Sequence, residues 1–373
     1  MVAAQDIPIL YLKQLVDKPP SLSNILPEPE DSGIKGAELA IRDNNSAGRF
    51  LGQRYVLELT QSKNVNELIE RARQWLASGR QLIALDLEAE ALLRLLDDPA
   101  IAGQGLLFNV SAPDDALRTT QCRTGLLHTA PSRAMLADAL MQFLVVKRWK
   151  EWFLIKGARA GDELFAQSLQ RASKKFGAKQ VAAKTWSFDT DLRRSAMQEI
   201  PAFTRGEDYD VIVVADETGD FGEYLPYNSA LPRPVTGTQG LTPLAWHRAV
   251  EQWGAAQLQS RFEKLAGRWM NSRDYGAWLA LRSIAEAVTR SGSEDFRELY
   301  AYLLSAKFEL AGFKGRALSF RAWNGQLRQP IPLVHPRALV ANAPLEGFLH
   351  PRSELDTLGF DRPETRCTFS DKL

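Results

Sequence analysis

The sequence predicts an α/β protein of two Rossmann-like lobes, each with a parallel sheet, joined by a hinge of several segments. Three observations predict this fold class. The 373 residues correspond to about two domains at roughly 150 residues each. Short apolar runs alternate with helical patterns in two successive series, which is typical of parallel sheets covered on both faces. After Gly240 the pattern changes to longer helices, long enough to return and complete the first lobe.

In the first series, short apolar runs predict buried strands, and apolar residues three and four positions apart predict helices. The expected strands are 7–12, 55–59, 82–85, 105–110 and 125–128, and the expected helices are 33–45, 65–76 and 89–96. We expect Asp31 and Ser32 to cap the first of these helices. The prolines between Lys13 and Asp31 exclude a helix from that stretch.

The second series repeats the pattern, and the tail adds a hairpin signal. Its expected strands are 152–155, 181–186 and 211–215, its expected helices are 135–146, 163–176 and 192–200, and the longer helices that follow are 243–265, 275–290 and 295–304. Asn324-Gly325, between the strand-like runs 318–323 and 326–334, predicts a hairpin. We expect the first lobe to comprise 1–129 and 240–316, and the second 130–239 and 317–373.

Composition excludes several classes of partner. With 46 Lys and Arg against 45 Asp and Glu, the net charge of +1 is unlike that of a nucleic-acid-binding protein. No run of fifteen apolar residues occurs, so we expect no membrane insertion. We expect the protein to be a monomer.

The N-terminus and the cysteines leave the compartment open. Met1 to Asp6 has neither the basic start nor the apolar stretch of a signal peptide, which fits a cytosolic protein or a mature exported chain. Cys122 and Cys367 lie 245 residues apart, which excludes a CxxC motif. They are either a disulfide that closes a long loop or two buried thiols.

Motifs for catalysis are absent from the sequence. It contains no GxxxxGK[ST] phosphate loop, no GxGxxG after a strand and no GxSxG nucleophile elbow. The four histidines are scattered without the spacing of a zinc site. We therefore expect no enzymatic activity and no cofactor.

Polar side chains gather at the predicted carboxyl ends of the strands, where open α/β sheets bind their ligands. The candidate ligand-binding residues are Asp31, Ser32, Asp86, Asn109, Ser111, His128, Thr129, Asp216 and Glu217. Each has a structural alternative. Asp86 and Asp216 could cap the next helix, Ser111 could belong to a plain turn, and His128 could be a core histidine.

Two classes of ligand fit these groups. The first is a small polar organic solute hydrogen-bonded by Asn109 and Ser111, which we favour. The second is a hard cation, free or chelated, held by carboxylates such as Asp86 and Asp216. A cation of this kind needs about six to eight oxygen ligands, and the carboxylate spacing is not a calcium-loop pattern. Most of the nine tryptophans fit core positions, but Trp246, just after a predicted crossing between lobes, could line the cleft.

Three segments resemble type I periplasmic solute-binding proteins. Asp31 to Gly52 resembles the family's first helix and its G-x-x-LA-x-x-x-N pattern, His128 to Arg133 resembles the first crossing between lobes, and Gly237 to Leu241 resembles the second. The resemblance spans about residues 7–335. It implies a periplasmic receptor that delivers a small ligand to an ABC transporter permease. The signal peptide is then missing from the printed chain, and a Cys122–Cys367 disulfide is expected.

Within this family, three runs resemble a branch associated with PQQ-dependent alcohol dehydrogenase systems. They are 43–52, 131–140 and 354–363. The branch implies a link to alcohol oxidation, and related clusters imply rare-earth (lanthanide) supply as the alternative. A role as a ligand sensor without transport also stays open. Ala158 to Asp162 lacks the tyrosine that amino-acid-binding relatives carry there, and Arg133 replaces their Asp, which argues against branched-chain amino acids. The proline-rich loop from Lys13 to Asp31 is longer than in relatives and is expected to cover the cleft.

Overall fold

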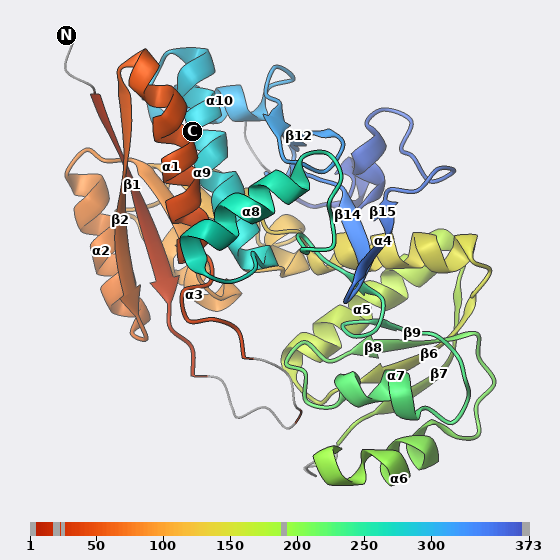
Figure 1. The fold of residues 1–373 in the computed structure, drawn as a ribbon. Helices are drawn as coiled ribbons and strands as arrows, with labels where there is room; N and C mark the ends of the chain where they lie inside the picture. Colours follow the sequence, from red (N-terminus) through yellow and green to blue (C-terminus); the bar gives the residue numbers. More distant parts are fainter. Residues whose placement is uncertain (1–4, 18–22, 24–26, 188–191, 368–373) are drawn as a thin grey trace.

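The computed structural model describes residues 5–17, 23, 27–187 and 192–367, which form two α/β lobes (Figure 1). The first lobe contains a five-stranded parallel sheet in the order β2-β1-β3-β4-β5. Its strands are β1 (Gln5–Gln14), β2 (Gln53–Ser62), β3 (Leu82–Asp86), β4 (Leu106–Asn109) and β5 (Leu126–His128). The strand order reverses between β1 and β3, and such a switch point opens a crevice beyond the carboxyl ends of the strands.

Helices cover both faces of this sheet because side chains along a strand alternate between its faces. Ile7, Ile9 and Tyr11 of β1 belong to the core on one face, whereas Leu10 and Leu12 belong to the core on the other. The helices on the first face are α1 (Ile34–Leu51), α8 (Ala255–Ala266), α9 (Ser272–Ser291) and α10 (Phe296–Leu304), and those on the second are α2 (Val65–Ala77) and α3 (Ala89–Leu96). The late helices thus complete the first lobe, as the sequence predicts.

The second lobe repeats the plan with a four-stranded parallel sheet in the order β7-β6-β8-β9 (Figure 1). Its strands are β6 (Glu151–Lys156), β7 (Lys179–Thr185), β8 (Val211–Ala215) and β9 (Val235–Gly237). The core on one face includes α4 (Arg133–Val146) and α5 (Ala160–Phe176), and the core on the other includes α6 (Leu192–Thr204) and α7 (Leu225–Asn228). Two lobes with parallel sheets confirm the predicted fold class.

Three crossing segments, 129–132, 238–241 and 329–330, carry the chain between the lobes. The Gln329 side chain joins two of them, because its amide donates a hydrogen bond to the Thr129 carbonyl at 2.8 Å. Lys314 Nζ in turn donates to Gln329 Oε1 at 2.7 Å. A small antiparallel sheet flanks these segments and consists of β10 (Thr242–Pro243), β14 (Ile331–His335) and β15 (Ala338–Ala343).

The hairpin predicted around Asn324-Gly325 is present, with a shorter second strand than expected. It follows β11 (Leu310–Ala311) and joins β12 (Ala317–Phe320) to β13 (Leu327–Arg328), with Phe320 opposite Leu327. The rest of the expected second strand forms β14 and pairs elsewhere. Leu318, Phe320 and Leu327 lie in the first-lobe core. We expected residues from 317 onward to belong to the second lobe, so this part of the predicted boundary differs from the structure.

Two local predictions are wrong. The helix expected over 243–265 begins only at Ala255, after Gly254 adopts a φ of 81°. Apolar residues before it, such as Trp246 and Val250, pack into the first-lobe core although they lie on irregular chain. Their spacing in the sequence is the same as that of residues on one face of a helix. The cap expected at Asp31 and Ser32 is also wrong, because α1 begins after Gly33 without any side-chain cap.

The C-terminal tail returns to the first lobe, and the predicted Cys122–Cys367 disulfide is confirmed, with a Cα–Cα distance of 5.7 Å. Before the tail leaves the second lobe, the backbone of Gly359 donates to Asp138 of α4 at 2.8 Å. Beside the disulfide, Thr365 Oγ1 donates to the Arg118 carbonyl at 2.9 Å. The last described residues therefore tie the second lobe back to the first.

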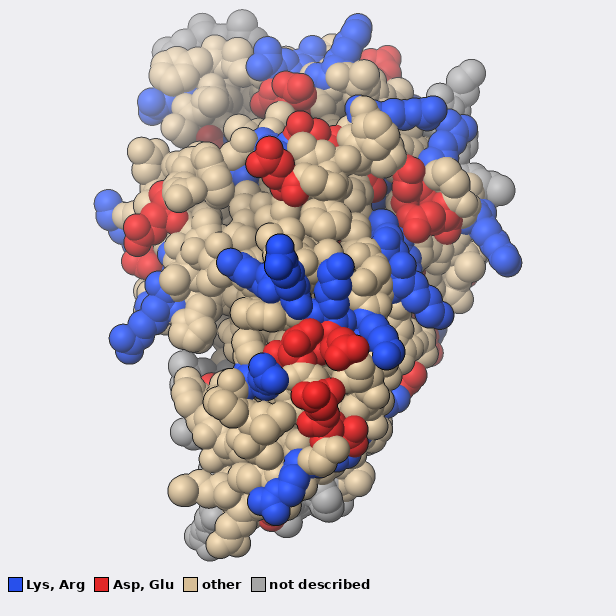
Figure 2. Space-filling model, turned by 90° about the vertical axis from the view of Figure 1, so that its right-hand side faces the viewer, with Lys and Arg blue, Asp and Glu red and all other residues tan. Residues whose placement is uncertain are grey.

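Charged side chains of both signs are intermixed over the face that Figure 2 shows. This distribution agrees with the net charge of +1. Among the helices of the described residues, none has both the length and the apolar composition that a bilayer crossing requires.

Candidate functional site

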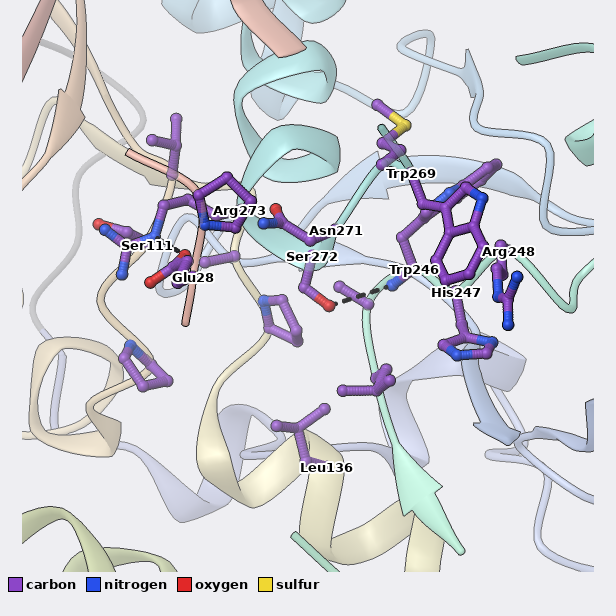
Figure 3. Close-up of a pocket in the computed structure, with 18 residues that line it drawn as sticks. Glu28, Ser111, Leu136, Trp246, His247, Arg248, Trp269, Asn271, Ser272 and Arg273 are labelled. Carbon is purple, nitrogen blue, oxygen red and sulfur yellow. Dashed lines mark hydrogen bonds and ion pairs between the residues drawn. The ribbon is translucent and has the colours of Figure 1, made fainter. Parts of the chain in front are cut away.

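A pocket of about 580 Å³ lies beyond the carboxyl edge of the first sheet, next to the crossing segments (Figure 3). Both lobes contribute to it, since Leu136 comes from α4 and most other residues come from the first lobe. The lining residues are Glu28 and Pro29; Val110, Ser111 and Pro113 after β4; Ala130 and Pro131 in the first crossing; Leu136; Leu244, Ala245, Trp246, His247 and Arg248 after β10; and Trp269, Met270, Asn271, Ser272 and Arg273 around the start of α9.

Trp246 forms a fixed aromatic wall of this pocket. Its ring stacks on Tyr275, with centroids 4.7 Å apart and an interplanar angle of 23°. Its indole N–H donates to Gln259 Oε1 at 2.9 Å. Its backbone N–H donates to Ser272 Oγ at 3.3 Å, a contact drawn as a dashed line in Figure 3. The expectation that Trp246 could line the cleft is therefore confirmed.

Beside Trp246 lies a cation stacked on a second tryptophan (Figure 3). The guanidinium carbon of Arg248 is 3.1 Å from the centroid of Trp269, whose exposed fraction is 53%. No carboxylate among the described residues forms an ion pair with Arg248. Burial, together with the neighbouring Arg248 charge, lowers the pKa of His247, so its imidazole is neutral at pH 7.

Arg273, at the opposite end of the pocket, has its charge compensated. Its Nη1 contacts Asp86 Oδ1 at 3.0 Å, and its Nε contacts Glu28 Oε1 at 3.0 Å. The Tyr11 hydroxyl donates to the second Asp86 oxygen at 3.0 Å. Burial and the Asp86 carboxylate raise the pKa of Tyr11 well above its ordinary value. Asp86 therefore orients Arg273, and Arg273 rather than Asp86 lines the pocket.

Asp31 and Ser32 support the chain around this end of the site. Asp31 accepts a hydrogen bond from Arg268 at 2.8 Å. Ser32 Oγ accepts one from the Asn271 amide at 2.7 Å, and the Ser32 carbonyl accepts one from Lys13 at 2.8 Å. Burial lowers the pKa of Lys13. Of these residues, only Asn271 lines the pocket.

Asn109, His128 and Thr129 form hydrogen bonds within the first lobe. Asn109 accepts from the Ala112 backbone at 2.9 Å, and its amide lies 3.0 Å from His128 Nδ1. His128 is buried, and this burial lowers its pKa well below the ordinary value. Thr129 Oγ1 donates to the Gly276 carbonyl of α9 at 2.8 Å. These contacts shape the loop that carries Ser111, the one residue of the nine candidates that lines the pocket.

Asp216 and Glu217 follow β8 in the second lobe. Asp216 accepts hydrogen bonds from three backbone N–H groups at 2.7–2.9 Å, those of Asp220, Phe221 and Gly222. Burial raises the pKa of Asp216. Glu217 pairs with Arg133. The structure does not bring Asp216 and Glu217 into the pocket, nor does it bring Asp86 and Asp216 together: they lie at the edges of different sheets.

Three further facts bear on the expected ligand set. Within the described residues, no three His, Cys, Asp or Glu side chains gather so as to hold a metal ion. Residues 18–22 and 24–26 of the proline-rich loop lie outside the described residues. Of that loop, Glu28 and Pro29 line the pocket, and Ser23 Oγ donates a hydrogen bond to the Gly219 carbonyl of the second lobe.

Sequence reasoning missed Arg248, Trp269, Asn271 and Arg273. These residues lie on irregular chain before α8 and at the start of α9, away from any strand end. The one sequence signal close to them was Trp246, placed just after a crossing segment.

The two lobes, their parallel sheets and the pocket at the lobe junction define the fold of type I periplasmic binding proteins. No protein-family model and no curated protein matches the chain. Solved structures do. A branched-chain amino acid ABC transporter periplasmic ligand-binding protein from Burkholderia xenovorans LB400 aligns with a TM-score of 0.74 at 18% identity, over 98% of this chain and 100% of that one.

Two more solved structures extend the likeness. A leucine-, isoleucine-, valine-, threonine- and alanine-binding protein from Brucella ovis, in a closed conformation, aligns with a TM-score of 0.73 at 14% identity, over 98% of this chain and 100% of that one. A solute-binding protein of an ABC transporter from Rhodopseudomonas palustris BisB5, in complex with 3,4-dihydroxybenzoic acid, aligns with a TM-score of 0.65 at 12% identity. This alignment covers 88% of this chain and 93% of that one. At these identities the likeness shows the fold.

Proposed function

We propose that this protein is a periplasmic solute-binding receptor that delivers a small organic ligand to the permease of an ABC transporter. The observation that carries the proposal is the pocket at the lobe junction, lined by Trp246 and Ser111 from one lobe and Leu136 from the other. The neighbours from Burkholderia xenovorans and Rhodopseudomonas palustris are named as ligand- or solute-binding proteins of ABC transporters, and the first of them as periplasmic. Like them, it needs no catalytic group, because binding alone serves transport.

Closure of the lobes would enclose the ligand. We propose the lobe bounds expected from the sequence, 1–129 with 240–316 and 130–239 with 317–373, with one change. The hairpin 317–328 moves with the first lobe, whose core it shares. The three crossing segments would form the hinge. In this scheme Ser111 contacts the solute directly, while the other strand-end candidates hold the loops that contact it.

The finer assignment to PQQ-linked alcohol oxidation rests on the resemblance of 43–52, 131–140 and 354–363 to that branch. It makes alcohols and the acids derived from them the first solutes to test. The alternative from the same branch, a rare-earth cation or its chelate, would have to be held by carboxylates that the pocket does not gather.

Calorimetry with alcohols, organic acids, amines, calcium and lanthanum tests the proposal. We expect one organic solute to bind, and Trp246→Ala to weaken that binding at least tenfold because the aromatic wall is lost. Trp149→Leu, on a half-buried tryptophan of the second lobe away from the pocket, is the matched control and should leave binding unchanged.

Three further measurements separate the alternatives. Small-angle scattering should show compaction with the bound solute, and unchanged curves with a saturating solute would contradict lobe closure. Sub-micromolar lanthanum binding that Asp216→Ala abolishes would favour the cation instead. Loss of solute uptake on deletion of the gene would separate a transport role from a purely sensing one.

A further inference from the structure

Two arginines line the pocket, and they differ in electrostatic state. Arg273 contacts two carboxylates, those of Asp86 and Glu28, each at 3.0 Å. Arg248 has no ion-pair partner among the described residues. Because His247 beside it is neutral at pH 7, Arg248 is the uncompensated charge of the lining. An uncompensated cation in a concave site attracts an anion.

Arg248 is also held in place for such a contact. Its guanidinium stacks on the Trp269 ring at 3.1 Å, which fixes the plane of the group. Stacking uses the flat face and leaves the N–H groups at the edge, which match the two oxygens of a carboxylate. The side chain of Arg248 has no hydrogen bond to another described residue. Its N–H donors can therefore bind an acceptor on a ligand.

Much of the pocket wall is apolar and partly aromatic. Trp246, Leu136 and Met270 are among the lining residues, and Figure 3 shows Trp246, Trp269 and Arg248 together on one side of the cavity. Rigid rings such as these pack best against a flat apolar body. A volume of about 580 Å³ limits the ligand to a small molecule.

At the far end of the pocket, the lining residues do not favour a second charged group on the ligand. Glu28 already accepts from Arg273, and Asn271 and Ser111 are neutral hydrogen-bonding groups. This end suits a hydroxyl or an apolar edge better than an ammonium group. An amino acid, which carries an ammonium group beside its carboxylate, therefore fits less well.

We propose that the solute is an organic carboxylate on a flat, apolar or aromatic body, and that Arg248 binds its carboxylate. This inference rests on the proposed function, since it names the ligand class of the same pocket. The carboxylate lies against the stacked Arg248 and Trp269, and the body lies along Trp246 and Leu136.

Calorimetry with four matched probes tests the ligand class: benzoate, benzyl alcohol, benzylamine and phenylalanine. We expect benzoate to bind at least tenfold tighter than the other three. Arg248→Gln should weaken benzoate binding about tenfold or more, the size of a lost charge-assisted contact. Arg248→Lys should lose less, because it keeps the charge but not the fork of donors. Arg337→Gln, on an exposed arginine between β14 and β15, is the control and should not change binding.

The other outcomes overturn the inference in distinguishable ways. Benzoate binding that is unchanged in Arg248→Gln, with the melting temperature of the variant intact, would remove Arg248 as the anchor. Tighter binding of benzyl alcohol or benzylamine would refute the carboxylate class and leave the receptor function standing. If no probe binds and the wider solute panel also fails, the inference and the proposed function fall together.

Discussion

The Arg133 guanidinium binds both carboxylate oxygens of Glu217, through Nε and Nη2, at 2.8 Å each. Its Nη1 is also in ion-pair contact with Asp114 Oδ1, at 3.2 Å. Asp114 follows β4 of the first lobe, and Glu217 follows β8 of the second. Arg133 therefore links the strand-end loops of the two lobes, two residues after Pro131 of the pocket wall.

Glu217→Gln should destabilise the folded protein by roughly 1–3 kcal/mol, because the Arg133 side chain is only 8% exposed and would lose its bidentate partner. Urea unfolding followed by circular dichroism measures the change. Glu163→Gln removes a more exposed carboxylate, paired with Lys156, and should change stability by less than about 1 kcal/mol. Equal effects of the two substitutions would contradict a special role for the Arg133 contact.

The double variant Cys122→Ser, Cys367→Ser should be less stable by roughly 2–5 kcal/mol, because the unfolded chain regains the freedom that the cross-link removes. Reductant should lower the melting temperature of the wild-type protein and leave that of the double variant unchanged. Thiol titration of the denatured, unreduced protein should find no reactive cysteine. Two reactive thiols would refute the disulfide.

Asp162 should make stability fall as the pH rises from about 4 to 7. Burial raises the pKa of Asp162 to about 6, from an ordinary value of 3.8, so the folded state retains a proton that the unfolded state releases. Partial screening by solvent leaves an effect on the order of 1 kcal/mol. Asp162→Asn should flatten this part of the pH profile of unfolding, and parallel profiles for the two proteins would contradict the assignment.

Lys314 should act in the opposite direction at alkaline pH. Burial lowers its pKa well below the ordinary value of 10.5, so between neutral and alkaline pH the unfolded state binds the extra proton. Stability relative to Lys314→Met should therefore rise as the pH goes from 7 to 10. Lys307→Met, on an exposed lysine, should show no such trend in the same urea titrations. A flat difference for Lys314→Met would mean that the folded protein holds this lysine charged.

The fold was largely predictable because buried strands leave a strong sequence signal. Val211 to Ala215 is apolar throughout, and the structure buries all five residues in β8. The signal fails where tertiary contacts determine the conformation. Trp246 and Val250 have the spacing of a helix face, yet they are buried from irregular chain. β9 was missed because Thr236 and Gly237 leave Val235 as its one strongly apolar residue, which is too few for an apolar run.

The candidate site was less predictable, for a physical reason. Polar residues at strand ends also have to satisfy the backbone groups of tight loops. Asp216, with three backbone donors, and Asn109, with the Ala112 backbone, serve that need. The pocket instead takes Arg248 and Arg273 from segments that the packing of α8 and α9 positions. No periodicity marks such residues in a single sequence.

The disulfide turns the chain between Cys122 and Cys367 into a covalent ring that begins and ends on the first lobe and contains the described residues of the second. A single peptide-bond cleavage anywhere in this ring, including any crossing segment, would leave one covalently connected molecule. Release of a fragment from this ring would need two cuts, or one cut followed by reduction of the disulfide. The bond therefore keeps the chain between the two cysteines in one piece after a first cut.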